Sequence, residues 1–426
     1  MSYVFSEYNI IGKNNGVAYI VNTLSGALIR LDKETYEALK LQNMDILSEQ
    51  QQTTLKNCGM LIDENIDEKR VMRAAYSAYC HGRKSLNVIA CPTLDCNFAC
   101  PYCFEERQKG SMSAEVENAL LRYVEKLLIH GYEQLNFEWF GGEPLLYPNL
   151  VDRVSHKIIK LCEKYRAEHT FSITTNGYCV DKAVLSVLSE IRFKEVRITL
   201  DGNRESHDTR RVLRNGQGTF DVIVSNIKKI SERGIQVKVR VNIDKQNPEA
   251  FFQVKKELDG IENLFIYPAT VVEEPTQDES QKAKCYAMNE YEDFHQTMYR
   301  TYGFKPSYEG IFRKGVCSCM AEHDESCVID HNGYVYKCVN DVGHPEWAIC
   351  NVLDSSEKRS AVAVSKYLGR DPLTETPCND CKLLPICYGG CVYELMRRKT
   401  HDCARVKYLF EDIVAEKLGS GKEKSI

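Results

Sequence analysis

The sequence lacks the features that mark several common classes of protein. No stretch approaches the roughly 18 apolar residues of a membrane-spanning helix, and residues 1–15 have no basic region followed by an apolar core. We therefore expect neither a membrane protein nor a secreted one. The 55 basic and 60 acidic residues give a net charge of −5, which argues against a nucleic-acid-binding surface. The ten histidines form no metal-binding motif.

Cysteine, in contrast, is abundant. The chain has 19 cysteines among 426 residues, and it is long enough to build a hydrophobic core without disulfide bonds. Three of them lie between residues 96 and 103, and ten lie between residues 317 and 403. Thiols in a reducing compartment stay free or bind metal. We therefore expect a cytoplasmic protein that binds metal, with a disulfide scaffold as the alternative.

The pattern at the N-terminal end predicts a small α+β module over residues 1–84. Two short apolar runs predict a hairpin, and Asp32, Ser48 and Asp67 are positioned to cap three helices. Strands mixed with three short helices are typical of a winged-helix-like module. The third helix has an apolar face, formed by Val71, Ala74, Ala75 and Ala78.

Regular strand–helix alternation follows over residues 85–272. Amphipathic stretches separate six predicted strands, at residues 86–91, 135–140, 170–175, 195–200, 235–243 and 263–271. Six such units predict a parallel sheet in the form of a partial (β/α)6 TIM barrel, so the expected fold class is α/β. Active sites on such sheets lie at the carboxyl ends of the strands.

Three further parts complete the chain. Residues 273–316 are polar and predict a linker or bridging region. Residues 317–403 are rich in cysteine and turn residues, which predicts a domain that owes its fold to metal sites. Residues 404–426 predict a C-terminal helix followed by a disordered tail.

Three cysteines directly follow the first strand of the barrel, in the sequence Cys96-Asn-Phe-Ala-Cys100-Pro-Tyr-Cys103. Three thiolates within eight residues are spaced to bind three irons of one [4Fe–4S] cluster, which leaves the fourth iron open to another ligand. A structural zinc site needs four closed ligands, usually in paired CxxC motifs. A zinc site completed by a distant cysteine is the alternative interpretation.

With Tyr102 before its last cysteine, this motif resembles the CxxxCxΦC signature of the radical S-adenosylmethionine (SAM) enzymes. The resemblance implies a [4Fe–4S] cluster held by Cys96, Cys100 and Cys103, which donates an electron to SAM bound at the open iron. It also implies that the resulting 5′-deoxyadenosyl radical abstracts a hydrogen atom from the substrate. The cofactor supplies this chemistry, and the protein excludes water and positions one C–H bond.

Further motifs follow the predicted strands in the order found in that family. Gly141-Gly142-Glu143-Pro144 resembles the GGEP motif, which binds the methionine amino group of SAM. By the same resemblance, Thr199 lies near the ribose and Arg211 near the SAM carboxylate. An ordinary turn or a solvated charge is the alternative at each position, and no catalytic base is assigned. The full set of implied cofactor-binding residues is Tyr102, Gly141, Gly142, Glu143, Asn176, Thr199 and Arg211.

The C-terminal cysteines resemble the SPASM extension of radical SAM enzymes, through the residues Gly333, Cys338, Cys378, Cys381, Cys387, Cys391 and Cys403. The resemblance implies two auxiliary [4Fe–4S] clusters, one of them held by Cys378, Cys381, Cys387 and Cys403. Cys338 and Cys391 would hold the other, with cysteines from the group Cys317, Cys319 and Cys327. Cys317 and Cys319 both fit the family's spacing to Gly333, and Cys327 stays open as an additional ligand. A pair of zinc sites is the alternative.

The same resemblance implies an enzyme that modifies peptides. Radical SAM enzymes with a SPASM extension mostly act on peptides or proteins, and the N-terminal module resembles the peptide-recognition element of maturases for ribosomally made peptides. In that family the leader of a precursor adds a strand to the edge of the module's sheet. The implied partners are a short ribosomal precursor peptide and an external electron donor of the flavodoxin or ferredoxin type. An interdomain scaffold is the alternative role for the module.

The expected reaction is the formation of thioether cross-links from cysteine sulfur to a carbon of another residue, as in ranthipeptide (SCIFF-type) maturases. The alternatives are carbon–carbon cross-links, formylglycine formation as in anaerobic sulfatase maturases, and a zinc-binding peptide scaffold without enzyme activity. Sulfatase maturases carry a general-base Asp directly after the GX4C cysteine, where this chain has Val339. That departure argues against formylglycine formation.

Overall fold

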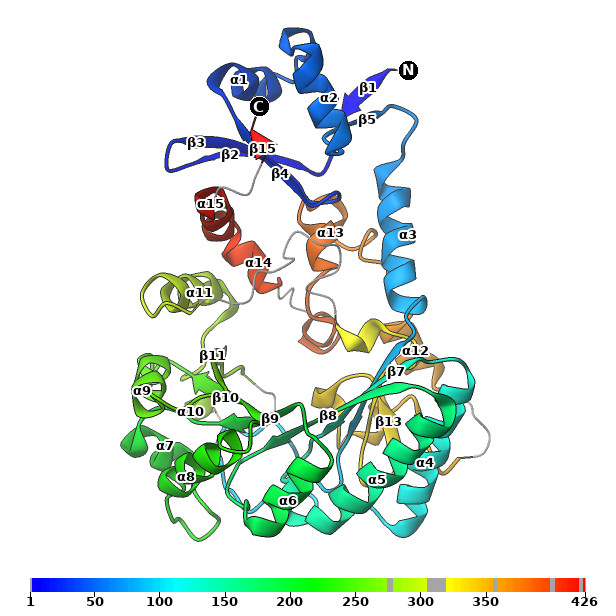
Figure 1. Cartoon of the computed structure of the whole chain (residues 1–426), viewed down its shortest axis with the longest axis vertical. Coiled ribbons are helices and arrows are strands. Elements are labelled where there is room, and N and C mark those ends of the chain that lie inside the picture. The colour runs from blue at the N-terminus through cyan, green and yellow to red at the C-terminus, as the bar shows by residue number, and fades with distance from the viewer. Residues whose placement is uncertain are drawn as a thin grey trace.

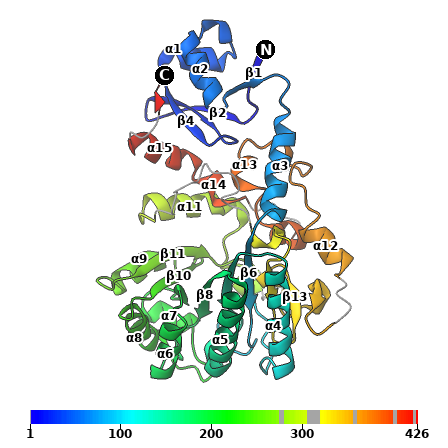
Figure 2. The same ribbon diagram turned by 45° about the vertical axis from the view of Figure 1, so that its right-hand side comes forward.

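The computed structural model describes residues 2–273, 279–304, 319–354, 359–398, 403–420 and 424–425. Cys317, one of the predicted cluster ligands, lies outside these residues. The N-terminal module and the barrel lie at opposite ends of the molecule, and the C-terminal helices lie between them (Figures 1 and 2). Within the described residues, no helix is long and apolar enough to cross a membrane.

The barrel consists of six parallel strands in the order β11-β10-β9-β8-β7-β6. Their bounds are β6 Ser85–Ala90, β7 Gln134–Trp139, β8 Glu168–Thr175, β9 Glu195–Thr199, β10 Gln236–Ile243 and β11 Leu264–Thr270. Each predicted strand is present, with both ends within two residues of the expected positions. The described strands β6 and β11 do not pair with each other, so the barrel is partial and the α/β fold class is confirmed.

Helices connect successive strands, as parallel pairing requires. They are α4 Ala114–Ile129, α5 Pro148–Tyr165, α6 Lys182–Glu190, α7 Arg204–Arg210, α8 Phe220–Ser231 and α9 Ala250–Glu257. In α4, the apolar side chains of Val116, Leu120 and Val124 recur at helical spacing and are buried against the sheet. The hydroxyl of Ser113 accepts the backbone N–H of Val116 and caps the helix.

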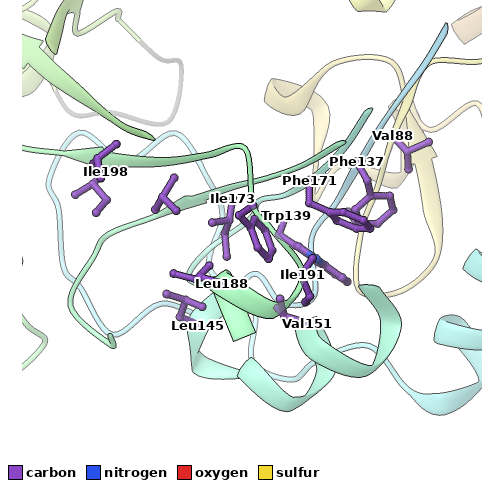
Figure 3. Packing of buried hydrophobic residues seen from close by; sticks show 14 of the residues in the cluster. Val88, Phe137, Trp139, Leu145, Val151, Phe171, Ile173, Leu188, Ile191 and Ile198 are labelled. Atoms are coloured by element: carbon purple, nitrogen blue, oxygen red, sulfur yellow. The ribbon is translucent and has the colours of Figure 1, made fainter. Parts of the chain in front are cut away.

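Large aromatic side chains fill the space between the strands and the helices. Figure 3 shows Phe137 and Trp139 of β7 beside Phe171 of β8, with Val151 of α5 below them. The ring centroids of Phe137 and Phe171 are 5.7 Å apart. The fully buried indole of Trp139 donates its N–H to the hydroxyl of Ser155 at 2.9 Å. This packing fixes β7 against α5 and so sets the position of the strand end that follows Trp139.

The cysteine-rich segment continues the barrel sheet. Strand β12 (Cys327–Ile329) pairs in parallel with β6, and β13 (Tyr334–Tyr336) and β14 (Cys350–Asn351) extend the sheet with antiparallel pairs. The domain boundary expected near residue 317 therefore does not separate two sheets. Two further helices in this segment are α12 (Ala361–Tyr367) and α13 (Leu384–Cys387).

The N-terminal module contains an antiparallel meander with helices on one face. Its elements are β1 Tyr3–Phe5, β2 Asn9–Asn14, β3 Val17–Asn22, β4 Ala27–Leu31, α1 Lys33–Lys40, α2 Glu49–Asn57, β5 Leu61–Asp63 and α3 Glu68–His81. The three predicted N-caps are confirmed, because Asp32, Ser48 and Asp67 each accept a backbone N–H three residues later. Strands β2, β3 and β4 pair in sequence order, and β1 pairs separately with β5.

The apolar face predicted for α3 is not the face that the structure buries. Val71 is 41% exposed, whereas Met72, Tyr76 and Cys80 are buried. These larger side chains pack on the cysteine-rich segment, against Leu373, Cys378, Leu384 and Tyr388. Burying the larger side chains removes more apolar area from water than burying alanines does, so the tertiary contact determines the face.

The C-terminal part of the chain returns to the N-terminal module. Its elements are α10 Glu279–Lys282, α11 Tyr291–Arg300, α14 Arg405–Tyr408, α15 Phe410–Ser420 and β15 Lys424–Ser425. Helix α15 packs on the sheet of the module, where Tyr19, Val21, Ile413 and Val414 belong to one buried cluster. The tail expected to be disordered includes β15, which pairs with β4.

His295 on α11 gives the fold a measurable pH dependence. Its ring stacks on Tyr408 of α14, and burial, followed by the charge of Arg405, lowers its pKa from 6.5 to about 3. Between these values the unfolded chain binds a proton that the folded chain does not, so stability falls as the pH drops below 6.5. We expect His295 to account for a loss of about 1 to 2 kcal/mol between pH 6.5 and pH 5.

The variant His295→Phe keeps a ring and removes the titrating group. The unfolding free energy, measured from denaturant unfolding curves, should therefore decrease less between pH 7 and pH 5 in this variant than in the unchanged chain. The same loss in both proteins would contradict a protonation-sensitive contact between α11 and α14.

Candidate active site

Cys96, Cys100 and Cys103 lie on the loop after β6, at the carboxyl end of the strand. Cys96 and Cys100 are half-buried, and Cys103 is exposed. Burial, together with the nearby Glu143, Cys100 and Cys103, raises the pKa of Cys96 to about 12, although the backbone N–H of Phe98 acts in the opposite direction. The structure thus places the three predicted ligands on one loop, and a bound cation would favour the thiolates of Cys96 and Cys103 there.

These thiols do not form a site for a single ion. In the described ranges, no three His, Cys, Asp or Glu side chains are close enough to hold one metal ion. A zinc site requires four ligands around one ion, whereas each thiolate of a [4Fe–4S] cluster binds a different iron. The cluster and zinc interpretations therefore differ in the ligands they need, which are one thiolate for each of three irons or four ligands around one ion.

The end of β7 is joined to the cysteine loop. The backbone N–H of Gly142 donates to the carbonyl of Thr93 at 3.1 Å, and that of Glu143 donates to the carbonyl of Asp95 at 2.9 Å. A Cβ atom at Gly141 would overlap Thr93, and one at Gly142 would overlap Asp95. The two glycines are thus required because the backbone after β7 packs closely on the backbone of the cysteine loop.

Glu143 is fully buried and already accepts three hydrogen bonds. Its Oε1 accepts from the backbone of Leu145 at 2.9 Å and the hydroxyl of Thr175 at 2.7 Å, and its Oε2 accepts from the backbone of Asn176 at 2.6 Å. Burial raises the pKa of this carboxyl, and the three hydrogen bonds act in the opposite direction. A carboxylate has about four acceptor positions, so Oε2 retains capacity for a further donor.

Asn176, at the end of β8, contacts the cysteine loop directly. Its amide donates to Oδ1 of Asn97 at 2.7 Å and lies 3.8 Å from the sulfur of Cys96. Its own Oδ1 accepts the backbone N–H of Tyr178 at 2.9 Å. The carboxyl end of β8 therefore helps to orient Cys96.

A polar network surrounds the phenol of Tyr102. Its hydroxyl donates to Asp201, and it accepts from Arg211 at 3.0 Å and from Asn242 at 3.3 Å. Arg210 forms an ion pair with Asp201 at 3.2 Å and extends the network into the barrel. Because Tyr102 lies between Cys100 and Cys103, this network fixes the cysteine loop to the interior of the barrel.

Arg211 is 8% exposed, and its Nε has no hydrogen-bond partner. A buried guanidinium N–H without a partner carries a desolvation cost that an anionic ligand would remove. The nearby oxygen of Tyr102 and the carboxylate of Asp201 keep the arginine charged, and its pKa lies above the usual range despite burial. Arg211 therefore provides a fixed positive charge at the site.

A cavity of about 190 Å³ lies among these residues, at the carboxyl ends of the barrel strands. Its lining combines the cysteine loop, Gly141, Gly142, Asn176, Thr199 and Arg211. Every predicted cofactor-binding residue except Glu143 lines this cavity, and Tyr102 does so from the cysteine loop. A larger cavity of about 850 Å³ lies between α4 and β14, and it contains none of the predicted site residues.

The described C-terminal cysteines form two groups. In the first, the thiol of Cys338 lies within electrostatic range of Cys319 and Cys391. In the second, Cys378 lies near Cys381 and Cys387, and Cys387 lies near Cys403. The ammonium of Lys407 donates to the sulfur of Cys403 at 3.4 Å.

Cys327 belongs to neither group. It is fully buried on β12, and its thiol lies near Lys337, Cys350 and Tyr123. These neighbours are on the side of the sheet that faces α4, since Tyr123 comes from that helix. The structure therefore separates Cys327 from the described cysteines with which it was grouped.

Residues 91–258 match a family model described as the Radical SAM superfamily. This part of the chain is therefore similar to the radical SAM superfamily. The matched residues begin directly after β6 and include the three cysteines, the glycine pair and Arg211. The likeness to this superfamily implies a [4Fe–4S] cluster and SAM, and the three thiols, the cavity and the unpaired Nε of Arg211 fit these groups.

Relatives of known name match more of the chain than residues 91–258. A cysteine-type anaerobic sulfatase-maturating enzyme of Clostridium novyi (strain NT) is 24% identical over 343 residues, which cover 72% of this chain and 88% of that enzyme. The structure of native anSMEcpe with bound AdoMet and Cp18Cys peptide has a TM-score of 0.62 at 19% identity and covers 79% of this chain and 99% of that one. SuiB of Streptococcus suis has a TM-score of 0.51 at 17% identity and covers 94% and 98%. These structural likenesses show a shared fold.

Two features of the candidate site were missed from the sequence. Asp201 joins Tyr102 to Arg210, and it follows β9 directly in the sequence Thr199-Leu200-Asp201-Gly202, which was interpreted only through Thr199. Glu105 lines the cavity with an Oε1 that has no partner, and burial raises its pKa to about 8. A strand-end aspartate is a recognisable signal, whereas Glu105 resembles a solvated charge in the sequence.

The glycine at position 141 provides a test of the loop packing. Gly141→Ala combines a φ of 100° with overlap of the new Cβ on Thr93 and Cys91, whereas Gly131→Ala has a φ of 92° and open space. Both variants carry about 1 kcal/mol of backbone strain, but only the first displaces the cysteine loop. We expect reductive SAM cleavage to fall about 100-fold in Gly141→Ala and to stay near the unchanged rate in Gly131→Ala. Equal rates in both variants would contradict the packing role.

Proposed function

We propose that this chain is a radical SAM peptide maturase that forms thioether cross-links in a ribosomally made precursor peptide. The observation that carries the proposal is the placement of three thiols at the cavity of a radical SAM domain, together with two further groups of thiols in the C-terminal segment. When bound, the cluster and SAM supply the radical that removes hydrogen from the substrate. The additional thiols are suited to hold a second and a third cluster.

The residues of the chain bind and orient these groups. In this proposal Cys96, Cys100 and Cys103 hold the first cluster, and Arg211 pairs with the carboxylate of SAM. Glu143 orients the cysteine loop through its backbone contact with Asp95 and accepts from the amino group of SAM through Oε2. The network around Tyr102 keeps the loop fixed while the buried surroundings exclude water.

The auxiliary clusters divide the C-terminal cysteines. One is held by the group of four, Cys378, Cys381, Cys387 and Cys403. The other is held by Cys319, Cys338 and Cys391, with Cys317 as the fourth ligand or with one iron open to a substrate thiolate. Cys327 is left as a buried core thiol, because its neighbours belong to α4 and β14. An iron open to a thiolate would favour thioether formation.

The N-terminal module is proposed to bind the precursor peptide. A small antiparallel sheet with an accessible edge binds extended peptides through backbone hydrogen bonds. The likeness to SuiB covers 94% of this chain, so it includes most of the module as well as the barrel. An external donor of the flavodoxin or ferredoxin type would supply the electrons.

The experiment uses the short open reading frame beside the gene. Its peptide is incubated anaerobically with the reconstituted chain, SAM and a reductant, and its mass and thiol content are measured. A thioether removes two hydrogen atoms and blocks one thiol against alkylation, while the sulfur is retained. A carbon–carbon cross-link also removes two hydrogen atoms but leaves all thiols open to alkylation. An unchanged peptide in the presence of SAM cleavage would overturn the proposal for that peptide.

Formylglycine formation is the second candidate, because the relative from Clostridium novyi matches 72% of this chain. The residue after Cys338 is Val339, and the nearest following carboxylate, Asp341, is fully buried and accepts the hydroxyl of Tyr367. In the same assay this reaction would remove sulfur from a cysteine peptide and leave an aldehyde. A scaffold without activity would yield zinc instead of iron after anaerobic purification.

A further inference from the structure

The outermost strand of the N-terminal sheet is the C-terminal end of the chain itself. The sheet has the order β15-β4-β3-β2, and β15 pairs in parallel with β4, with Lys424 opposite Ile29 and Ser425 opposite Arg30. Figure 1 shows β15 in red beside the blue strands of the module. Residues separated by almost the whole chain thus form one sheet.

Helix α15 anchors this strand close to its partner. The helix packs on the face of the sheet, and the hydroxyl of Tyr19 on β3 donates to Oε1 of Glu411 at 2.8 Å. Only residues 421–423 separate the end of α15 from β15. A connection this short holds the tail at an effective concentration on the order of millimolar near the edge of β4.

The two edges of the sheet differ. The outer strand on the other side is β2, and α15 lies against it, with the amide of Asn14 donating to the backbone carbonyl of Glu411 at 3.0 Å. Among the described residues, strand addition occurs at β4. The edge of β4 is therefore the position in this module where an extended segment adds through backbone hydrogen bonds.

The contact made by β15 is suited to exchange. Within the part of the chain that the structure describes it covers two residues, whereas β4 has five, Ala27–Leu31. A short edge strand that contains lysine is a common means of protecting a sheet from uncontrolled pairing. An external peptide that pairs with the whole of β4 would form more backbone hydrogen bonds than the tail does, although the tail has the advantage of its short connection.

We propose that β15 is an internal competitor that occupies the peptide-binding edge of β4 until an extended segment of the substrate peptide replaces it. This inference rests on the proposed function, because it assigns a regulator to the peptide site of the module. The tail protects the edge from other strands and raises the peptide concentration needed for binding. If the tail occupies the edge for about 80 to 90% of the time, it weakens the apparent affinity for the peptide about 5- to 10-fold.

The test uses two full-length variants with changes only in β15. Lys424→Pro with Ser425→Pro removes both backbone N–H donors and prevents strand pairing, whereas Lys424→Arg with Ser425→Thr keeps the donors and the charge. The first readout is amide hydrogen exchange at residues 27–31, measured without any peptide. We expect the proline variant to exchange about 5- to 10-fold faster there than the unchanged chain, and the control variant to match the unchanged chain.

The second readout is the dissociation constant for the peptide encoded beside the gene. The dissociation constant of the proline variant should fall by the same factor by which its amide exchange rate rises. Both quantities depend on the fraction of molecules in which the edge of β4 is open. Unchanged exchange in the proline variant would overturn the proposal, and so would faster exchange without tighter binding. Failure of the proposed function would be seen separately, as an unmodified peptide in the mass measurement, and the exchange result does not depend on it.

Discussion

Cys96→Ala is expected to abolish reductive cleavage of SAM and to lower the iron content by about four atoms per chain. Cys96 is the first of the three thiols at the barrel cavity, and loss of one thiolate leaves two protein ligands for the cluster. Two ligands do not retain a cluster whose fourth iron is bound only by an exchangeable group. Iron and sulfide analysis of the anaerobically reconstituted protein, together with 5′-deoxyadenosine quantification, measures both effects.

Cys179→Ala provides the matched control. Its sulfur accepts the amide of Asn97 at 3.6 Å, so it lies beside the cysteine loop but outside the motif. The control should keep its full iron content and cleave SAM at a rate within a few-fold of the unchanged chain. If Cys96→Ala retained cleavage, or if Cys179→Ala lost iron to the same extent, the assignment of the three ligands would be wrong.

Arg370→Ala is expected to destabilise the junction between α3 and the cysteine-rich segment by about 3 to 5 kcal/mol. The Arg370 side chain is 1% exposed, and it pairs with the equally buried Glu322 at 3.2 Å. It also binds Glu375 and donates to the carbonyl of Gly389 at 2.6 Å. Glu322 in turn accepts the hydroxyl of Tyr76 on α3 at 2.6 Å. Removal of the arginine leaves a buried carboxylate without its cation.

Arg73→Ala tests the same junction at its surface. Arg73 on α3 pairs with Asp371 at 3.1 Å, but the two side chains are 51% and 32% exposed. Solvent screens this pair, so its loss should cost no more than about 1 kcal/mol. Hydrogen exchange of α3 amides reports the free energy of opening for both variants. Similar small changes in both would contradict a buried pair that holds the junction.

Local sequence signals predicted much of this structure correctly. The six barrel strands were located from apolar runs between amphipathic stretches, and Asp32, Ser48 and Asp67 were identified as caps because a short polar side chain satisfies the first free N–H groups of a helix. The barrel site followed from motifs at strand ends, since parallel strands bring their carboxyl ends to one edge. These features depend on residues close together in the sequence.

Features set by distant contacts were not predictable in the same way. The buried face of α3 depends on Tyr388 and Leu384, which lie more than 300 residues further along the chain. The pairing of β12 with β6 and of β15 with β4 also joins distant segments through backbone hydrogen bonds, which carry no sequence signature. The isolation of Cys327 has the same origin, because its strand joins the barrel sheet and turns its thiol towards Tyr123.

The most direct test of the account is the amount of 5′-deoxyadenosine formed when the anaerobically reconstituted, otherwise unchanged chain is mixed with SAM and a strong reductant. With the substrate peptide, the account predicts more than one molecule of 5′-deoxyadenosine per chain. Without the peptide, it predicts a smaller but measurable amount of 5′-deoxyadenosine relative to the amount of chain. It also predicts none when the reductant is omitted. A chain that contains about twelve iron atoms and forms no 5′-deoxyadenosine under these conditions would contradict the account.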